Sequence, residues 1–244
     1  MTSYHGGKQR IGLRIAKQIH SIHENKHKSI GYCEPFCGML GVYQHIPDLF
    51  NQKMSYLAGD TNDSVIRMWK RAQKKWKPPT TCTKDEYDRL KVASSSALKG
   101  YIGHQYSFGG QYFMGYAPLY GKTVDSSKAS TKVVSIAKKL STATFSTGSY
   151  TQYSNLSNFI IYCDPPYQNT SQRYKVMDGF DSEEFWDWCR MMSKKNIIFV
   201  SCYIAPNDFT EVASFSHKLT GIIHSNADKN RTEKLYYLVG YKYI

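Results

Sequence analysis

The residues best suited to chemistry in this 244-residue chain are Asp164, Pro165, Pro166 and Tyr167, directly after the apolar run 159–163. Each proline fixes φ at about −65° and lacks a backbone N–H, so the turn is stiff and its carbonyl oxygens can accept hydrogen bonds. The Asp164 carboxylate and the Pro165 carbonyl can together accept both hydrogens of an exocyclic amine, while Tyr167 covers the face of the ring. The alternative is a proline turn that caps a strand.

A glycine-bearing loop and a downstream acid predict a nucleotide site. The stretch 29–34 has the pattern of a strand, and Gly38 and Gly41 lie in the loop after it. A second predicted strand, 54–60, ends at Asp60, 22 residues beyond Gly38. In nucleotide-binding βαβ units, an acid about 20 residues beyond the glycine loop binds the ribose hydroxyls. Most Gly-x-x-Gly loops are ordinary turns, and it is the acid that favours nucleotide binding here.

The net charge of +13 predicts an anionic partner. Basic residues cluster in two segments: Lys70, Arg71, Lys74, Lys75 and Lys77 in the first, and Lys128, Lys132, Lys138 and Lys139 in the second. Phosphates neutralised by such side chains release condensed counterions, so a nucleic acid is the polyanion that we expect. A merely soluble basic protein is the alternative, which the clustering disfavours.

The six cysteines do not predict a metal site, because Cys33 and Cys37 lack a second cysteine or histidine pair at a useful distance. Cys163, Cys189 and Cys202 fall in apolar runs and are expected to be small buried side chains. The sequence shows neither a signal peptide nor a long uncharged apolar stretch, so we expect an intracellular protein with no membrane span.

Apolar periodicity predicts an α/β fold. Further predicted elements are helices at 11–20, 62–69 and 182–193, and strands at 159–163, 196–202, 219–225 and 234–243. Strands that alternate with helices indicate a mostly parallel sheet, here with an antiparallel hairpin at the C-terminal end.

The character of the chain changes between about residues 70 and 142. Lysine, serine, threonine and glycine dominate, and glycines alternate with aromatic residues over 100–116. This pattern, flanked by lysines, favours a surface that binds DNA or RNA. A loop packed on its own side chains is the alternative.

Three segments together closely resemble the motifs of the Dam-type DNA adenine-N6 methyltransferases: Gly6-Gly7-Lys8, Glu34-Pro35-Phe36-Cys37-Gly38 and Asp164-Pro165-Pro166-Tyr167. Their order, with the basic insertion before the catalytic tetrapeptide, resembles the α-order class, and 185–190 and 230–235 are similar to versions in phages and large DNA viruses. The resemblance covers nearly the whole chain. It implies a Rossmann-like methyltransferase domain (1–69 and 140–244) and an inserted, mainly helical target-recognition domain (70–139).

The resemblance also implies a cofactor, a substrate and site residues. S-adenosylmethionine is the expected methyl donor, with no metal, and double-stranded DNA is the expected partner of a monomer or weak homodimer. The implied cofactor-binding residues are Tyr4, Gly6, Gly7, Lys8, Glu34, Pro35, Phe36, Gly38, Asp60, Ser149, Tyr150 and Asp164. The implied catalytic residues, which act on a flipped adenine, are Asp164, Pro165, Pro166 and Tyr167. Candidate DNA-binding residues are Lys74, Lys75, Lys77, Gln105, Ser107, Gln111, Lys122 and Arg231.

Alternatives to adenine methylation remain open. Cytosine-N4 methyltransferases usually begin this tetrapeptide with serine, and RNA or protein amide methyltransferases more often with asparagine, so Asp164 favours adenine. A DNA-binding protein that has lost activity is a further reading, which the intact Asp60, Asp164 and Tyr167 disfavour. GATC specificity is not carried over, because Ser3 stands where relatives that methylate GATC have a basic residue, and Phe108 to Tyr116 differs from their recognition hairpin.

Overall fold

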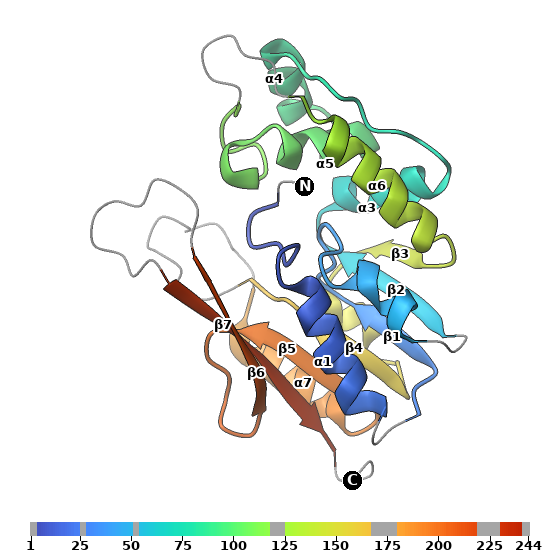
Figure 1. Cartoon of the computed structure of the whole chain (residues 1–244), viewed down its shortest axis with the longest axis vertical. Coiled ribbons are helices and arrows are strands. Elements are labelled where there is room, and N and C mark those ends of the chain that lie inside the picture. The colour runs from blue at the N-terminus through green and yellow to red at the C-terminus, as the bar shows by residue number, and fades with distance from the viewer. Residues whose placement is uncertain are drawn as a thin grey trace. The chain divides into compact units, whose positions relative to one another are not determined.

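The computed structural model describes residues 4–24, 28–50, 54–117, 125–166, 180–218 and 230–240 (Figure 1). Its helices are α1 (Gly12–Glu24), α2 (Ile46–Leu49), α3 (Asp63–Gln73), α4 (Lys84–Val92), α5 (Ala97–Gln105), α6 (Ser127–Lys139) and α7 (Ser182–Ser193). Its strands are β1 (Gly31–Glu34), β2 (Ser55–Asp60), β3 (Thr144–Thr147), β4 (Phe159–Cys163), β5 (Ile197–Cys202), β6 (Thr210–Lys218) and β7 (Asn230–Val239).

The strands form one seven-stranded sheet with the order β3-β2-β1-β4-β5-β7-β6. The pairs β2–β3, β1–β4 and β4–β5 are parallel, whereas β7 runs antiparallel to both β5 and β6. The order 3-2-1-4-5 is that of a doubly wound sheet. The structure therefore confirms the predicted Rossmann-like α/β fold with an antiparallel C-terminal hairpin.

The predicted elements match the structure best where the chain is most apolar. The strand 159–163 and the helix 182–193 agree at both ends with β4 and α7. The tail differs, because the strand before the final turn is β6 at Thr210–Lys218, whereas the predicted strand 219–225 lies outside the described residues. The last strand also begins earlier than predicted, at Asn230.

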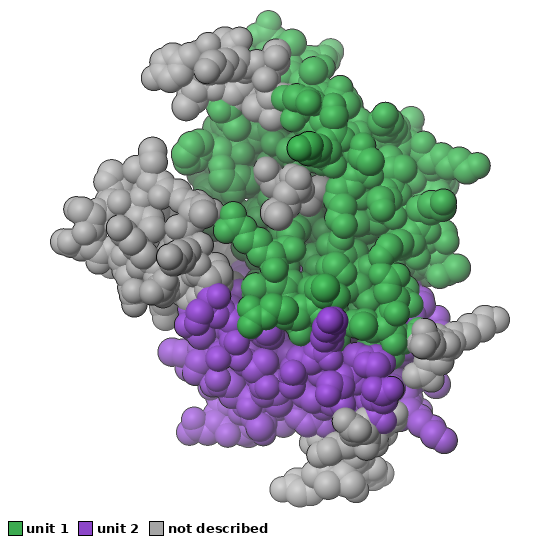
Figure 2. Space-filling model, in the orientation of Figure 1, with its two compact units in different colours: residues 1–16, 37–51, 57–149 green, residues 17–36, 52–56, 150–244 purple. Residues whose placement is uncertain are grey.

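The chain is divided into two compact units (Figure 2). Unit 1 comprises residues 1–16, 37–51 and 57–149, and unit 2 comprises residues 17–36, 52–56 and 150–244. The predicted insertion 70–139 falls wholly within unit 1, where its regular elements are helical. Its role as a separate recognition domain stays a prediction.

Helix α3 organises unit 1. The Asn62 side chain caps its first turn by accepting hydrogen bonds from the backbone N–H groups of Ser64 and Val65. Helix α5 packs closely on α3, because a Cβ atom at Gly100 would lie only 2.1 Å from the carbonyl oxygen of Ser64. At the other end of α3, the Gln73 amide donates to the carbonyls of Leu140 and Ala143, just beyond α6. These contacts join α5 and the end of α6 to α3, which carries the buried Trp69.

The glycine and aromatic segment 100–116 is largely internal to unit 1, and its expected role as a surface that binds DNA or RNA stays a prediction. Tyr101, Tyr106 and Phe113 are buried, and Gly103 lies against the rings of Tyr112 and Phe113. The exposed large side chains of this segment are Phe108 and Met114. The alternative of a segment packed on its own side chains describes most of it.

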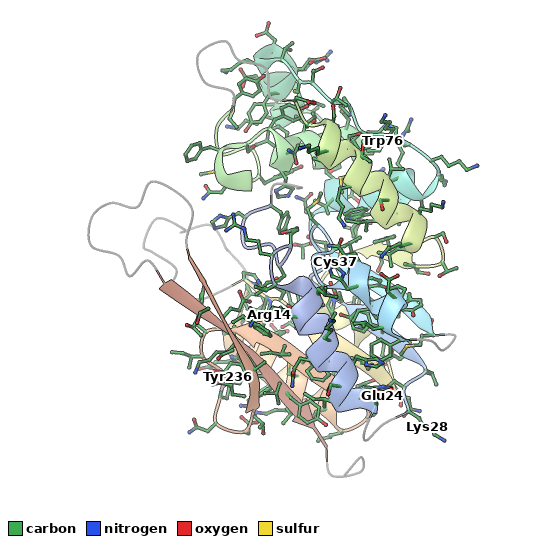
Figure 3. The ribbon with its side chains drawn as sticks, viewed as in Figure 1. Arg14, Glu24, Lys28, Cys37, Trp76 and Tyr236 are labelled. Atoms are coloured by element: carbon green, nitrogen blue, oxygen red, sulfur yellow. The ribbon has the colours of Figure 1, made fainter. Side chains whose placement is uncertain are left out.

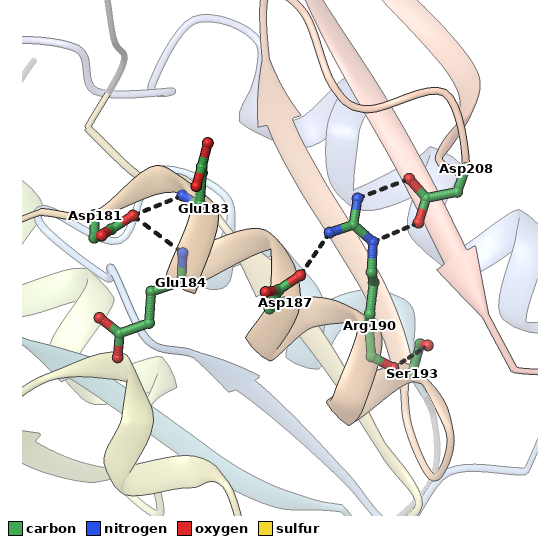
Figure 4. Close-up of polar contacts among 7 residues, drawn as sticks. All are labelled: Asp181, Glu183, Glu184, Asp187, Arg190, Ser193 and Asp208. Atoms are coloured by element: carbon green, nitrogen blue, oxygen red, sulfur yellow. Dashed lines mark hydrogen bonds and ion pairs between the residues drawn. The ribbon is translucent and has the colours of Figure 1, made fainter.

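In unit 2, helix α7 is held at both ends (Figure 4). Asp181 caps its first turn by accepting hydrogen bonds from the backbone N–H groups of Glu183 and Glu184. Near its end, Arg190 donates to Asp187 and, through two nitrogens, to both carboxylate oxygens of Asp208. The bidentate pair connects α7 to the segment that leads into β6, and it holds the pKa of Asp208 below its ordinary value.

Candidate active site

Candidate site residues fall in both units. In unit 2, Glu34 ends β1 and Asp164 follows β4. These two strands are parallel, with Cys33 paired to Ile161, and both are buried along their whole length. Because parallel neighbours end at the same edge of a sheet, the two acids lie at one edge.

Glu34 is a buried acid with a defined partner. The carboxyl group is almost fully buried, at 3 % exposure, and Oε1 accepts a 2.7 Å hydrogen bond from the hydroxyl of Tyr32. Burial raises the pKa of Glu34 well above its ordinary value, and the nearby charge of Asp164 raises this pKa further, while the Tyr32 bond opposes the shift. Asp164 itself is half-buried. The carboxyl ends of β1 and β4 therefore carry two interacting carboxyl groups, which differ in their access to solvent.

Pro165 is buried and Pro166 is half-buried, so the turn after Asp164 is largely shielded from solvent. Tyr167, the predicted cover of the substrate ring, lies outside the described residues.

Phe36 and Tyr150 belong to one aromatic cluster of unit 2. Their ring centroids are 5.6 Å apart with an interplanar angle of 28°, so the rings stack. Tyr150 is buried, with Phe185 and Trp188 against its edge, whereas Phe36 is half-buried. Pro35 is buried at the start of this loop. That Phe36 and Tyr150 bind the cofactor stays a prediction.

In unit 1, Asp60 and Gly38 form the core of a second group. Asp60 ends β2, and its two carboxylate oxygens accept hydrogen bonds from the backbone N–H groups of Gly38 (2.9 Å) and Asn62 (2.8 Å). Gly38 has a φ of +43°, and a Cβ atom there would lie 2.7 Å from Cζ of Tyr4. The position requires glycine because both the backbone conformation and the Tyr4 ring exclude a side chain. The indole N–H of Trp69 donates to the Gly38 carbonyl and fixes the other side of the loop.

The segment Gly6-Gly7-Lys8 lies next to the same loop within unit 1. Lys8 is buried, and its ammonium donates to the carbonyl of Gly6 at 2.9 Å. The backbone of Lys8 contacts Gly41, where a Cβ atom would lie 2.9 Å from the Lys8 backbone nitrogen. The segment Gly6-Gly7-Lys8 and the loop that contains Gly41 are far apart along the sequence, and they are in direct contact in the structure.

Ser149 also lies near Asp60. It is exposed, and the N–H of its neighbour Gly148, which has a φ of +149°, donates to the Asp60 carbonyl at 3.1 Å. The end of β3 and the end of β2 are therefore joined at the residue predicted to bind ribose.

The candidate DNA-binding residues differ in their accessibility. Lys74, Lys75 and Lys77 are exposed just beyond α3, on either side of the half-buried Trp76 (Figure 3). Gln105 and Gln111 are half-buried. Lys122 lies outside the described residues, and Arg231 is described only by its backbone position in β7, opposite His217.

Ser107, a candidate base-reading residue, has no exposed position in the structure. Ser107 is buried, and its hydroxyl donates to the Gly103 carbonyl at 2.6 Å. The same hydroxyl lies 2.7 Å from the hydroxyl of Tyr87 and accepts from the N–H of Phe113. Its hydrogen-bonding capacity is used to hold the segment 103–113 together.

Sequence reasoning missed His104, which lies in α5 next to the first motif. Its ring is 4.5 Å from that of Tyr4 and 4.8 Å from that of Tyr112. Burial lowers the pKa of His104 to about 4, so the ring is neutral at pH 7. Its place among glycines and aromatic residues was the only signal in the sequence, and that signal did not distinguish it from its neighbours.

Among the residues that the structure describes, no group of three or more histidine, cysteine or acidic side chains is placed to hold a metal ion. All six cysteines, including Cys37, are buried, and none of them forms a disulfide bond (Figure 3). No helix in the described part of the chain is both long and apolar enough to cross a membrane.

No protein-family model and no curated protein matches the chain. Similar solved structures include the methylase candidate HI0767 from Haemophilus influenzae, with 12 % identity, a TM-score of 0.41, and coverage of 94 % of this chain and 99 % of that one. The methyltransferase candidate yhhF from Escherichia coli has 8 % identity, a TM-score of 0.38 and coverage of 93 % and 87 %. An rRNA-methylase candidate from Clostridium thermocellum has 7 % identity, a TM-score of 0.35 and coverage of 91 % and 96 %.

Proposed function

We propose that the chain is an S-adenosylmethionine-dependent DNA methyltransferase that acts on N6 of adenine. The observation that carries the proposal is the position of Asp164, half-buried directly after the central strand β4 and beside the buried Glu34. The tetrapeptide that begins at Asp164 is also the segment that most specifically resembles the amino methyltransferases.

The residues of unit 1 fit the ribose of S-adenosylmethionine. Asp60 uses one hydrogen bond on each oxygen to hold the backbone of Gly38 and Asn62. A carboxylate has about four acceptor sites, so lone pairs remain for two ribose hydroxyls. The backbone bonds fix the orientation of the carboxylate, and burial raises its pKa, which donors from a ligand would lower again.

Tyr4 and Lys8 would hold the methionine end of the cofactor. Lys8 is a buried cation near the glycine loop, and a buried charge is stabilised by an opposite charge such as a carboxylate. Phe36, Ser149 and Tyr150 would flank the adenine. When bound, S-adenosylmethionine supplies a methyl group on a sulfonium centre, which needs an aligned nucleophile and no covalent enzyme intermediate.

The chain's own contribution to catalysis would be orientation. Asp164 and the Pro165 carbonyl would accept hydrogen bonds from the adenine amine, so that its lone pair is localised and directed at the methyl group. Tyr167 would stack on the flipped base. The fixed carboxylate of Asp164 would also stabilise the positive charge that develops on N6 during transfer. S-adenosylhomocysteine would be the leaving group, and the surplus proton on N6 would pass to solvent. Exposed lysines beyond α3 would bind the phosphates of the duplex.

The test is transfer of a labelled methyl group from S-adenosylmethionine to unmethylated duplex DNA by the wild-type chain and by Asp164→Ala. We expect the substitution to lower transfer by about 100- to 1,000-fold or more, because it removes a fixed charge at the reacting centre. Duplex binding, measured by fluorescence anisotropy, should persist. Asp187→Asn is the matched control, since Asp187 is an exposed acid of the same unit that contacts Arg190.

The product identifies the substrate. Label in N6-methyladenine supports the proposal, whereas label in N4-methylcytosine or in RNA assigns the chain to another amino substrate. If wild-type chain neither binds S-adenosylmethionine nor labels any nucleic acid, the proposed function is wrong. Loss of duplex binding in Asp164→Ala would show that this residue is structural.

A further inference from the structure

His104 is a buried imidazole enclosed by two tyrosines within unit 1. The side chain is 7 % exposed, and its ring lies 4.5 Å from Tyr4 and 4.8 Å from Tyr112, with both partners tilted against it. Tyr4 covers Gly38, whose N–H is bound by Asp60, and Tyr112 interacts with Asn62 and Ser64 just after Asp60. His104 is therefore joined on both sides to the residues that surround Asp60.

The hydrogen bonds of His104 fix the chemical character of each ring nitrogen. Nδ1 lies 3.0 Å from the carbonyl oxygen of Gly110, and since a carbonyl can only accept, Nδ1 carries the hydrogen. The N–H of His5 donates to the same carbonyl at 3.2 Å. In the neutral ring Nε2 is consequently an acceptor, and it is a buried atom with no hydrogen-bond partner in the described part of the structure. A buried acceptor without a donor is unfavourable, so a ligand that supplies one is stabilised here.

We propose that Nε2 of His104 accepts a hydrogen bond from the α-ammonium group of S-adenosylmethionine. The inference rests on the proposed function, because it assigns a contact to the cofactor of that same site. The ribose hydroxyls already have an acceptor in Asp60, and the cofactor carboxylate has no hydrogen to donate. The adenine amine is expected beside Phe36, Ser149 and Tyr150, so the α-ammonium is the remaining donor. An ammonium group has three hydrogens to donate, so it suits an unpartnered imidazole acceptor. Tyr4 belongs to the segment expected at the methionine end.

Two substitutions separate the roles of the two nitrogens. His104→Asn keeps an amide N–H near the position of Nδ1 and removes the acceptor at Nε2, whereas His104→Gln places an amide oxygen near Nε2 and loses the bond to Gly110. We expect His104→Asn to weaken binding of S-adenosylhomocysteine by about 10- to 100-fold, as for a hydrogen bond to a charged group. His104→Gln should stay within about threefold of wild type. Isothermal titration calorimetry measures both, after circular dichroism has shown that each variant is folded.

Deaminated S-adenosylhomocysteine, which lacks only the α-amino group, is the second probe. Wild type should bind it about 10- to 100-fold more weakly than S-adenosylhomocysteine, and His104→Asn should show almost no difference between the two ligands. If His104→Gln loses affinity while His104→Asn retains it, the ring serves only to anchor Gly110, and the proposal is overturned. Equal losses for both ligands would likewise make His104 structural.

The failure of this inference is distinguishable from the failure of the proposed function. If wild type binds neither S-adenosylmethionine nor S-adenosylhomocysteine, the proposed function fails, and this inference fails with it. If wild type binds them and Asp60→Ala abolishes that binding, but His104→Asn changes nothing, only the role of His104 is wrong.

Discussion

At the scale of single residues, the sequence predicted the acids at strand ends better than it predicted the groups around them. Glu34, Asp60 and Asp164 could be found because each follows a short apolar run, and this pattern is visible in the sequence alone. The burial of Ser107 and the enclosure of His104 could not, since Ser107 is hydrogen-bonded to Tyr87 of α4, and His104 is enclosed by Tyr4 and Tyr112. Such contacts join segments that no local pattern connects.

His104 also makes stability depend on pH. Its pKa is lowered from 6.5 to about 4 by burial, so between these values the unfolded chain binds a proton that the folded chain does not. The contribution of His104 to the free energy of unfolding is therefore fully present above pH 6.5, and it is lost as the pH falls toward 4. The expected loss over this range is about 3 kcal/mol.

Urea denaturation of wild type and His104→Gln at pH 7 and pH 4 measures this loss. Other groups titrate in both proteins, so the difference between the two pH dependences isolates His104. The wild type should lose about 3 kcal/mol more than the variant on acidification. Equal losses would mean that His104 is accessible to protons in the folded state.

At the scale of elements, β4 and α7 were predicted accurately, whereas β6 was not. β4 and α7 have dense apolar patterns and were found with correct ends. β6 was missed because it is an edge strand in which polar residues occupy most positions. Its place in the sheet is determined by pairing with β7, and such pairing is not encoded in the pattern of one strand.

The contact between α5 and α3 gives an element-scale prediction. Replacing a helical glycine by alanine ordinarily stabilises a helix by about 1 kcal/mol. At Gly100 the added Cβ would lie 2.1 Å from the backbone carbonyl of Ser64, so Gly100→Ala must displace α5 from α3. We expect a net destabilisation of about 1–3 kcal/mol in urea denaturation.

Leu98→Ala, at a partly exposed position of the same helix, is the control and should cost less. A stabilised Gly100→Ala variant would show that the two helices do not approach as closely as described.

At the scale of the whole molecule, charge distribution predicts how the chain meets a polyanion. Removing Lys74, Lys75 and Lys77 together, each replaced by glutamine, should weaken duplex binding and reduce the slope of log K against log salt by up to about 3. Fluorescence anisotropy at several salt concentrations measures both quantities.

Lys17, Lys28 and Lys194 form the matched control, because they are exposed lysines of unit 2 and their removal changes the net charge equally. If both triple variants lower the slope to the same extent, binding depends on the total charge of the chain. The lysines beyond α3 then have no specific role in phosphate binding. An unchanged slope in the first variant would show that these lysines do not contact phosphate.

The position of β7 has a consequence for how the protein is made. β7 lies between β5 and β6, and it is the last strand of the sheet in chain order. During synthesis β5 is therefore complete while the edge that will bind β7 still exposes its backbone groups, and such an edge can pair with another chain. The sheet in unit 2 can be completed only after translation of residue 239. Aggregation therefore competes with folding while unit 2 is still being synthesised.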